Sequence, residues 1–410
     1  MNNYLKIAIV KTARILLMAG WVFPVSKRKV LFSSYEGMSY TCNPKYIFEG
    51  LHDRCADSIQ YVWALNDPHK LPEKSAGSVK AVKYLSPSHI YHFLTAKVIV
   101  SNLGIEPIIP KRKSQTFINT WHGGGAYKRV SADMNMFSKS ESKYINSMKD
   151  IRKKQTDVFL SSCEAFTNVS SKDFAIDKDI FVPTGMPRND ILLDKSKCDE
   201  IRKKVLNSLN IDTTDLVVLY APTFRGSHRG QMNIDIDVCT DIVERAFKEK
   251  FNRNVTFLYR SHISKESSDL KDNFSCTKII DATKYPDMQE LLAAADVLIT
   301  DYSSSIWDFA LTLKPGFLYT PDLKKYLEDR GFYYPIEDWQ YPYAQTVSEL
   351  VDCISNYSPE AAIEKIKRHQ ALLSSFEKGT AIPQTVDLIC KALGPNDSEN
   401  SSDHRRPRNA

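Results

Sequence analysis

The sequence predicts an α/β protein with two doubly wound, mostly parallel sheets that face each other across a cleft. Short β-rich segments alternate with helical segments along the chain, which is the order expected of consecutive βαβ units. Several of these segments are continuous apolar runs, as in strands that are buried on both faces of a parallel sheet. The alternation pauses at a polar joint, 212–215, and then restarts. A chain of 410 residues is long enough for two such domains.

The first half contains β-rich segments with apolar centres at 30–34, 59–65, 79–85, 97–102, 116–125, 157–162 and 180–185. Helices are expected between them, near 45–53, from Ser88, around 143–153, from Glu164 and over 195–209. In the second half we expect strands at 216–223, 255–260, 278–280 and 297–299, and helices at 238–250 and 287–295. In open parallel sheets, ligands bind at the carboxyl ends of the strands. Functional residues are therefore expected at those ends.

The stretch 295–319 organises the second half. Its apolar run, 297–299, is typical of a buried strand that ends at Thr300–Asp301. The hydroxyl groups of 302–305 can cap a helix that continues until Pro315 and Gly316. A sharp turn from strand to helix directs free N–H groups and the positive end of the helix dipole at the sheet edge, so the turn is a candidate pyrophosphate cradle. A turn that only caps its helix is the alternative.

These patterns divide the chain into four parts. We expect an amphipathic membrane-associating segment at 1–28, a Rossmann-like N-terminal domain at 29–210, a Rossmann-like C-terminal domain at 211–393 and a disordered tail at 394–410. In 4–25, an apolar run too short for the ~20 residues of a membrane span lies between basic residues, and no signal-peptide cleavage site follows it. Such a helix can lie in the headgroup layer of a membrane, or it can pack on its own domain.

Composition sets few limits on function. The contents of 42% hydrophobic and 25% charged residues are ordinary for a globular protein, and the net charge is +6. The basic runs 27–29 and 111–113 are expected to be solvated, so nucleic-acid binding is not predicted, whereas an anionic membrane or a phosphate-rich substrate fits. The eight cysteines form no CxxC pair and no metal-ligand spacing, which indicates reduced thiols of a cytosolic protein. We expect no metal site and no cofactor.

His122 is the first candidate catalytic residue. It follows an apolar run that closes with Trp121, and it precedes Gly123, Gly124 and Gly125, which let a substrate approach the backbone. Histidine is suited to general base catalysis near neutral pH. Further along the chain, Arg188 lies in a rigid turn, where it can clamp a phosphate or brace the turn.

In the second half, three strand ends carry residues suited to phosphate binding. An arginine offers a permanently charged fork for phosphate oxygens, and a histidine can donate from a ring nitrogen. The candidate substrate-binding residues at these strand ends are Pro222, Thr223, Arg260, Ser261, His262, Asp301, Ser303 and Ser304.

The series WHGGG, GMPRND, VLYAPTFRG, YRSH, DVLITDYSSSIWDFA and RGFYYP, in this order, resembles the CDP-glycerol glycerophosphotransferase family of teichoic-acid primases and polymerases. The resemblance covers about residues 30–375. It implies a GT-B fold, a CDP-activated donor bound mainly by the C-terminal half, and peripheral attachment to the cytoplasmic face of the membrane, where a lipid-linked acceptor lies. It also implies that His122 is the general base, while Arg188, Pro222–Thr223, Arg260, His262 and Ser303–Ser304 contact the donor. The resemblance is also compatible with assembly of the chain into a homo-oligomer.

One departure from the family pattern concerns the acceptor. The family commonly has Thr-Pro after His-Gly, where this chain has Gly124–Gly125. Three further interpretations stay open. The chain is a GT-B glycosyltransferase that uses a nucleotide sugar, a ribitolphosphotransferase that uses CDP-ribitol, or a non-catalytic membrane-associated subunit of an envelope-polymer complex.

Overall fold

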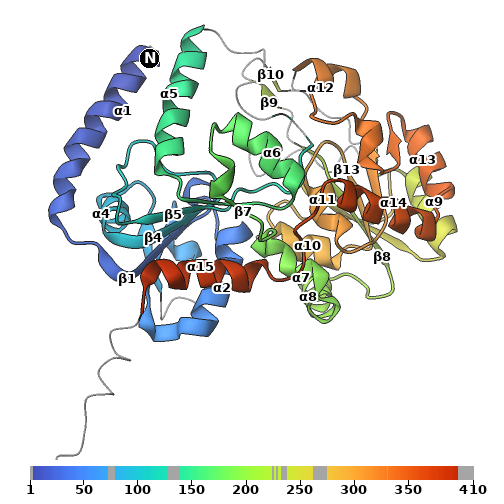
Figure 1. The fold of residues 1–410 in the computed structure, drawn as a ribbon. Coiled ribbons are helices and arrows are strands. Elements are labelled where there is room, and N and C mark those ends of the chain that lie inside the picture. Colours follow the sequence, from blue (N-terminus) through green and yellow to red (C-terminus); the bar gives the residue numbers. More distant parts are fainter. Residues whose placement is uncertain are drawn as a thin grey trace, which may run out of the picture.

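The computed structural model describes residues 3–72, 79–127, 129, 139–223, 226–227, 230–231, 238–261, 275–329 and 331–395. Two parallel sheets lie side by side, each with helices packed against it (Figure 1). The predicted α/β class with two doubly wound sheets is confirmed. His262 and the basic residue Arg225 lie outside the described residues, as does the tail from 396 onward.

The first sheet has seven strands in the order β3-β2-β1-β4-β5-β6-β7, and every neighbouring pair is parallel. Its strands are β1 (Ser26–Ser33), β2 (Gln60–Leu65), β3 (Val79–Lys83), β4 (Ala96–Ser101), β5 (Thr116–Asn119), β6 (Val158–Leu160) and β7 (Phe181–Val182). The helices between them are α2 (Cys42–Cys55), α4 (Pro87–Thr95), α5 (Lys139–Gln155) and α6 (Glu164–Asp173), and α7 (Asp190–Leu193) and α8 (Lys195–Leu209) follow. All of them except α7 lie where the apolar pattern predicts a strand or a helix.

The second sheet has six strands in the order β12-β11-β8-β13-β14-β15, also parallel throughout. They are β8 (Leu216–Ala221), β11 (Val255–Tyr259), β12 (Ile279–Asp281), β13 (Val297–Thr300), β14 (Gly316–Tyr319) and β15 (Tyr343–Ala344). A two-stranded ribbon, β9 (Gly226–Ser227) and β10 (Gly230–Gln231), stands apart. The helices are α9 (Asp241–Phe251), α10 (Met288–Ala294), α11 (Ser305–Ala310), α12 (Leu323–Asp329), α13 (Val347–Ser355), α14 (Pro359–Leu372) and α15 (Ala381–Leu393).

Some local expectations are wrong. The helix after Ser304 ends at Ala310 rather than near Pro315, because Leu313 adopts a left-handed conformation with φ 57° that ends the helical path. Gly316 then begins strand β14, which the sequence pattern did not indicate. The run 27–29 is not fully solvated either. Lys29 lies in β1, is 4% exposed, and donates a hydrogen bond of 2.8 Å from Nζ to Thr95 Oγ1.

The last helix returns to the first sheet. Although α15 follows the second sheet in the chain, it packs against α2 and β4 (Figure 1). Val386, Ile389 and Leu393 belong to the same buried cluster as Val30 and Ile47. The two halves are therefore joined by the return of the chain as well as by the contacts between them.

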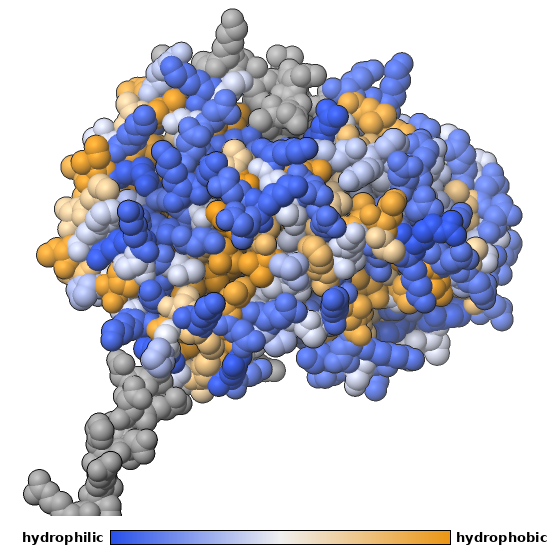
Figure 2. All heavy atoms as spheres, viewed as in Figure 1, coloured by the Kyte–Doolittle hydropathy of each residue, from blue (hydrophilic) through white to orange (hydrophobic). Residues whose placement is uncertain are grey.

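Helix α1 (Asn3–Leu17) packs along α5 and contains no buried residue. Apolar side chains of α1 and of the 3₁₀ turn that follows it, Met18–Val22, are exposed, and Figure 2 shows hydrophobic atoms along this edge. The exposed apolar residues include Leu5, Ile9, Ile15, Leu16, Met18, Trp21 and Val22. Within the described part of the chain, no helix combines the length and the apolar character needed to cross a membrane.

Candidate functional site

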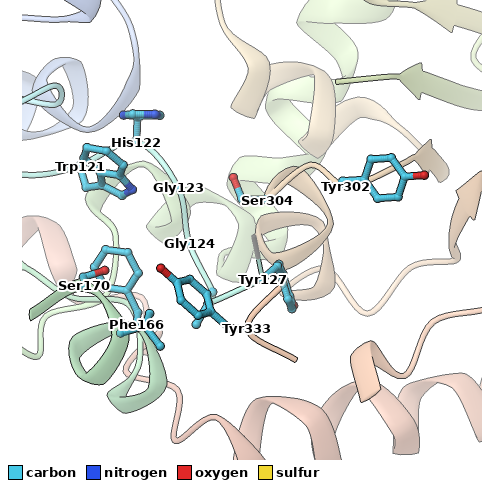
Figure 3. A pocket seen from close by; sticks show the side chains of 13 residues that line it. Trp121, His122, Gly123, Gly124, Tyr127, Phe166, Ser170, Tyr302, Ser304 and Tyr333 are labelled. Carbon is cyan, nitrogen blue, oxygen red and sulfur yellow. The ribbon is translucent and has the colours of Figure 1, made fainter. Parts of the chain in front are cut away.

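The carboxyl ends of the two sheets meet at a loop that carries His122. Strand β5 leads into Trp121–Tyr127, named here the histidine loop, and β13 leads into the turn that starts α11. The two segments touch: a Cβ atom built on Gly123 would lie 3.2 Å from Ser304 Oγ (Figure 3). The site therefore combines the predicted base of one half with the predicted phosphate-binding turn of the other.

The backbone before His122 is strained and well supported. Trp121 has φ 50°, which is unusual for a bulky side chain. Its N–H donates to Asn119 Oδ1 at 3.0 Å, and its carbonyl accepts from Asn43 Nδ2 at 3.0 Å. Strain of this kind persists only where the surroundings enforce it, and it is common at functional sites.

A backbone contact fixes the orientation of the His122 ring. Its Nδ1 lies 2.9 Å from the carbonyl oxygen of Asn102. A carbonyl oxygen can only accept, so Nδ1 carries the proton in this contact and Nε2 of the neutral ring holds the lone pair. Nε2 is thus the nitrogen that can take a proton from a substrate hydroxyl.

A pocket of about 100 Å³ lies beside the histidine loop (Figure 3). Three segments far apart in the sequence enclose it: the loop itself, one face of α6, and residues of the second half. Its lining residues are Trp121 to Tyr127, Phe166, Val169, Ser170, Tyr302, Ser304 and Tyr333.

Gly124 and Gly125 of the loop are each required for a different structural reason. A Cβ atom on Gly124 would lie 2.1 Å from Cδ1 of the buried Trp307, so no larger residue fits without displacing that ring. Gly125 has φ 66°, a conformation closed to proline, whose φ is near −65°. The position of Trp307 and the backbone conformation of Gly125 therefore leave no room for the family's Thr-Pro at these two positions.

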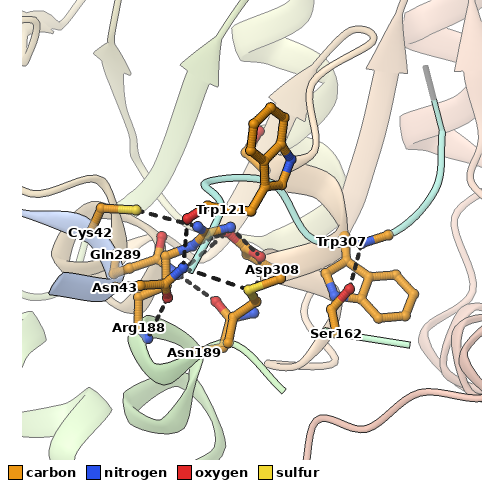
Figure 4. Close-up of polar contacts among 12 residues, drawn as sticks. Cys42, Asn43, Trp121, Ser162, Arg188, Asn189, Gln289, Trp307 and Asp308 are labelled. Carbon is orange, nitrogen blue, oxygen red and sulfur yellow. Dashed lines mark hydrogen bonds and ion pairs between the residues drawn. The ribbon is translucent and has the colours of Figure 1, made fainter. Parts of the chain in front are cut away.

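Arg188 forms a buried ion pair with Asp308. Its Nε donates to Asp308 Oδ2 at 3.0 Å, its Nη2 donates to Asp308 Oδ1 at 3.2 Å, and its Nη1 contacts Cys42 Sγ at 3.4 Å (Figure 4). Burial alone would lower the pKa of Arg188, but Asp308 raises it above the ordinary value. Of the two roles that the sequence allowed for Arg188, the geometry matches a brace, with Asp308 of α11 as the partner.

Further buried polar groups extend this brace. Asn189 Nδ2 donates to Asp308 Oδ1 and to Glu377 Oε1, each at 3.0 Å, and Gln289 Nε2 donates to Asn189 Oδ1 at 2.6 Å. Burial raises the pKa of Glu377 to about 8. We call Arg188, Asn189, Gln289, Asp308 and Glu377 the interdomain cluster. Sequence patterns did not find Gln289, Asp308 or Glu377, since their partners lie at distant positions of the chain.

Arg260 has the features of an anion-binding residue. It is 9% exposed, and among the described residues its guanidinium makes one hydrogen bond, from Nη1 to the Tyr285 carbonyl at 2.8 Å, and no ion pair. Desolvation lowers the pKa of Arg260, because burial disfavours its charged form, while Asp287 acts in the opposite direction. A guanidinium has five N–H donors, so several remain available to a phosphate.

The other predicted residues of the second half lie in the turn after β13 or at the ends of β8 and β11. Thr223 N donates to both carboxylate oxygens of Asp301, at 3.0 and 2.9 Å, so these two residues tie the ends of β8 and β13 together. Ser303 Oγ accepts from Ser305 N at 3.2 Å, and Ser261 N donates to Thr283 Oγ1 at 3.0 Å. Pro222 is partly exposed at the end of β8. The structure thus brings Trp121–Gly125 and Ser304 together, whereas Arg260 lies at the end of β11, two strands away from β13.

Comparisons with known proteins agree on one family. A family model described as CDP-Glycerol:Poly(glycerophosphate) glycerophosphotransferase matches residues 15–391. The teichoic acid poly(glycerol phosphate) polymerase of Staphylococcus epidermidis is 28% identical over 389 residues, which cover 90% of this chain and 51% of that protein. The teichoic acid ribitol-phosphate primase of Bacillus spizizenii is 27% identical over 381 residues, which cover 91% of this chain and 93% of that protein. The chain spans about half the length of the polymerases of S. epidermidis and Bacillus subtilis that it matches.

A solved structure of a teichoic acid polymerase is also similar to this chain. The wall teichoic acid polymerase TagF, as a variant soaked with CDPG, superposes with a TM-score of 0.79 at 26% identity and covers 98% of both chains. The UDP-GlcNAc 2-epimerase of Neisseria meningitidis reaches a TM-score of 0.51 at 13% identity, which is a likeness of fold alone.

The interdomain cluster generates a stability prediction. Asp308→Asn leaves the buried Arg188 without its counter-charge and should lower the free energy of unfolding by about 3–5 kcal/mol. The matched control is Glu364→Gln, which removes the exposed Arg368–Glu364 pair and should cost less than about 1 kcal/mol. Urea unfolding of both variants measures the difference. Equal, small losses would show that the pair contributes nothing beyond a surface contact.

Proposed function

The chain belongs to the CDP-glycerol:poly(glycerophosphate) glycerophosphotransferase family, and we propose that it transfers glycerol phosphate, or a related polyol phosphate, from a CDP-activated donor. The acceptor is a hydroxyl group of a lipid-linked or polymeric molecule in the synthesis of teichoic acid or a capsule, and CMP is released. The observation that carries the proposal is the contact between the histidine loop and the turn at Ser304, with the buried Arg260 at the same sheet edge.

The proposed mechanism uses these groups in sequence. His122 Nε2 takes the proton of the acceptor hydroxyl, and the oxygen attacks the β-phosphorus of the donor. The bond between that phosphorus and the bridging oxygen breaks, and CMP leaves with the bridging oxygen. Arg260 neutralises charge on the pyrophosphate, and such positioning and charge neutralisation supply most of the acceleration in phosphoryl transfers.

A donor panel tests this proposal. The purified chain is incubated with CDP-glycerol, CDP-ribitol and UDP-sugars, and nucleotide release is followed. We expect CMP release, with either polyol, because relatives named as glycerol-phosphate and ribitol-phosphate enzymes are similarly close. UDP release without CMP release would instead assign a nucleotide-sugar glycosyltransferase.

Replacement of the base should reduce turnover without loss of donor binding. A general base contributes about 10²–10⁴-fold, so His122→Ala should lower kcat by that order while the donor Kd is kept. The control is His69→Ala, since His69 is exposed. Turnover of His122→Ala equal to that of the control would remove His122 from the mechanism.

Replacement of Arg260 should weaken donor binding. Arg260→Met removes a charged hydrogen bond to the pyrophosphate and should cost about 1.5–3 kcal/mol of binding free energy for a CDP-polyol or for CDP. Calorimetry provides the measurement, with Arg368→Met on the exposed face of α14 as control. Unchanged affinity would indicate that Arg260 serves only to hold the Tyr285 carbonyl.

We also propose that the protein binds the cytoplasmic face of the membrane through α1 and Met18–Val22. The support is the exposed apolar edge described above, in which Ile15 is 68% exposed and Leu16 is 69% exposed. Not all nearby charges are available to lipid headgroups. Arg14 donates to the Pro107 carbonyl and to Gln155, and Lys29 is buried, so attraction to anionic lipid would depend on other residues, among them Lys11.

Liposome flotation measures this attachment. The double variant Ile15→Glu/Leu16→Glu should abolish binding to anionic vesicles, because it places charge on the apolar edge. Leu372→Glu is the control, since Leu372 is 71% exposed on α14, away from α1. High salt should weaken the binding of the unchanged protein. Equal flotation of all three proteins would place the membrane contact elsewhere.

A further inference from the structure

Two cysteines that are 335 positions apart in the sequence lie side by side where α15 packs against α2 (Figure 1). Sγ of Cys55, the last residue of α2, is 3.9 Å from Sγ of Cys390 on α15. Both side chains are partly exposed, and both thiols are free. The S–S distance in a disulfide is about 2.05 Å, so a short approach of the two sulfur atoms would allow a bond.

Contacts on both sides of this cysteine pair hold the two helices together. Arg54 of α2 and Asp387 of α15 form an exposed ion pair. Cys55 and Cys390 also pack against the buried apolar cluster to which Val386 belongs. The fold itself therefore keeps the two sulfur atoms close, and rotation of side chains at a helix end is the movement that a bridge requires.

The surroundings favour a reduced pair at rest. Burial raises the pKa of the Cys390 thiol, and the neighbouring Cys55 adds to this effect, whereas Arg54 acts in the opposite direction. A raised pKa leaves little thiolate at neutral pH, and the thiolate is the reactive form of a cysteine. We therefore expect the pair to stay reduced in a reducing compartment and to react when an oxidant is in excess.

We propose that Cys55 and Cys390 form a reversible modification site, at which a small-molecule disulfide oxidises the two thiols to a bridge between α2 and α15. One protein thiolate attacks a sulfur atom of the oxidant, forms a mixed disulfide and displaces one small thiolate. The second cysteine attacks the protein sulfur of the mixed disulfide and displaces the other. Two protein thiols are thus oxidised, the oxidant is reduced to two small thiols, and the protons of the protein thiols pass to them.

The bridge would clamp the last helix to the first half of the chain. Release of α15 exposes Val386, Ile389 and Leu393, which are buried in the cluster of the first sheet. A disulfide restricts the unfolded chain, and in the chain-entropy model the effect grows with the length of the closed loop. The oxidised protein should therefore unfold at a higher temperature, and the amide protons of α15 should exchange more slowly.

Oxidised glutathione is the probe, and the full chain is the sample. Peptide mass spectrometry without reductant locates the bridge, and thermal unfolding is recorded before and after reduction with dithiothreitol. We expect a linked peptide that contains Cys55 and Cys390, and a Tm higher by at least about 4 °C that returns to its first value on reduction.

Cys55→Ser and Cys390→Ser are the test variants, and Cys353→Ser is their control. Cys353 is also partly exposed, but it lies on α13, where its thiol contacts the Tyr343 carbonyl at 3.8 Å. Each test variant should lose both the linked peptide and the rise in Tm. The control should keep both.

Peptide mapping also separates this site from a second pair, since Cys276 N donates to the Cys239 carbonyl at 3.3 Å. A bridge at Cys239 and Cys276 alone, or only mixed disulfides with glutathione, would overturn the proposed site. A bridge between Cys55 and Cys390 that leaves Tm and exchange in α15 unchanged would overturn the clamp. None of these results depends on CMP release, so the proposed function is tested separately.

Discussion

The buried ion pair between Arg188 and Asp308 determines how the two halves meet. Asp308 lies on α11, the helix that begins at the predicted phosphate-binding turn, and Arg188 follows the last strand of the first sheet. The backbone N–H of Arg188 donates to Asn43 Oδ1 at 3.1 Å, and Asn43 in turn holds the carbonyl of Trp121. A continuous set of contacts thus links α11 to the residue before His122. The position of His122, the predicted base, relative to the turn depends on this link.

Such a link is costly to desolvate and specific in geometry. A buried ion pair adds little net stability over apolar packing, but removal of one partner leaves an unpaired buried charge. Here each partner has several hydrogen bonds, from Asn189 and Gln289 to Asp308 and from Arg188 to Asp308 and Cys42. The arrangement therefore disfavours other relative placements of the sheets. A reaction that needs a base on one half and phosphate ligands on the other benefits from this restriction.

Local patterns predicted most strands, the positions of most helices and the strand-end placement of His122, because burial on both faces leaves a clear apolar run. They did not predict β14 and β15, or the burial of Lys29, whose Nζ contacts Thr95 only in the folded sheet. The two roles of Arg188 could not be separated, since Asp308 is 120 positions away. The pocket beside His122 gave no signal in the sequence, because three distant segments enclose it.

The path of α15 has a consequence for synthesis of the chain. Val386, Ile389 and Leu393 complete the apolar core around Val30 and Ile47, so the core on this side of the first sheet, which α2 covers in part, stays incomplete until the last helix emerges from the ribosome. Domains generally fold in the order in which they are made, and exposed apolar surface on an incomplete chain is prone to aggregate. In this protein the half that is made first is the half that is completed last, and its nascent form exposes the apolar surface that α15 later covers.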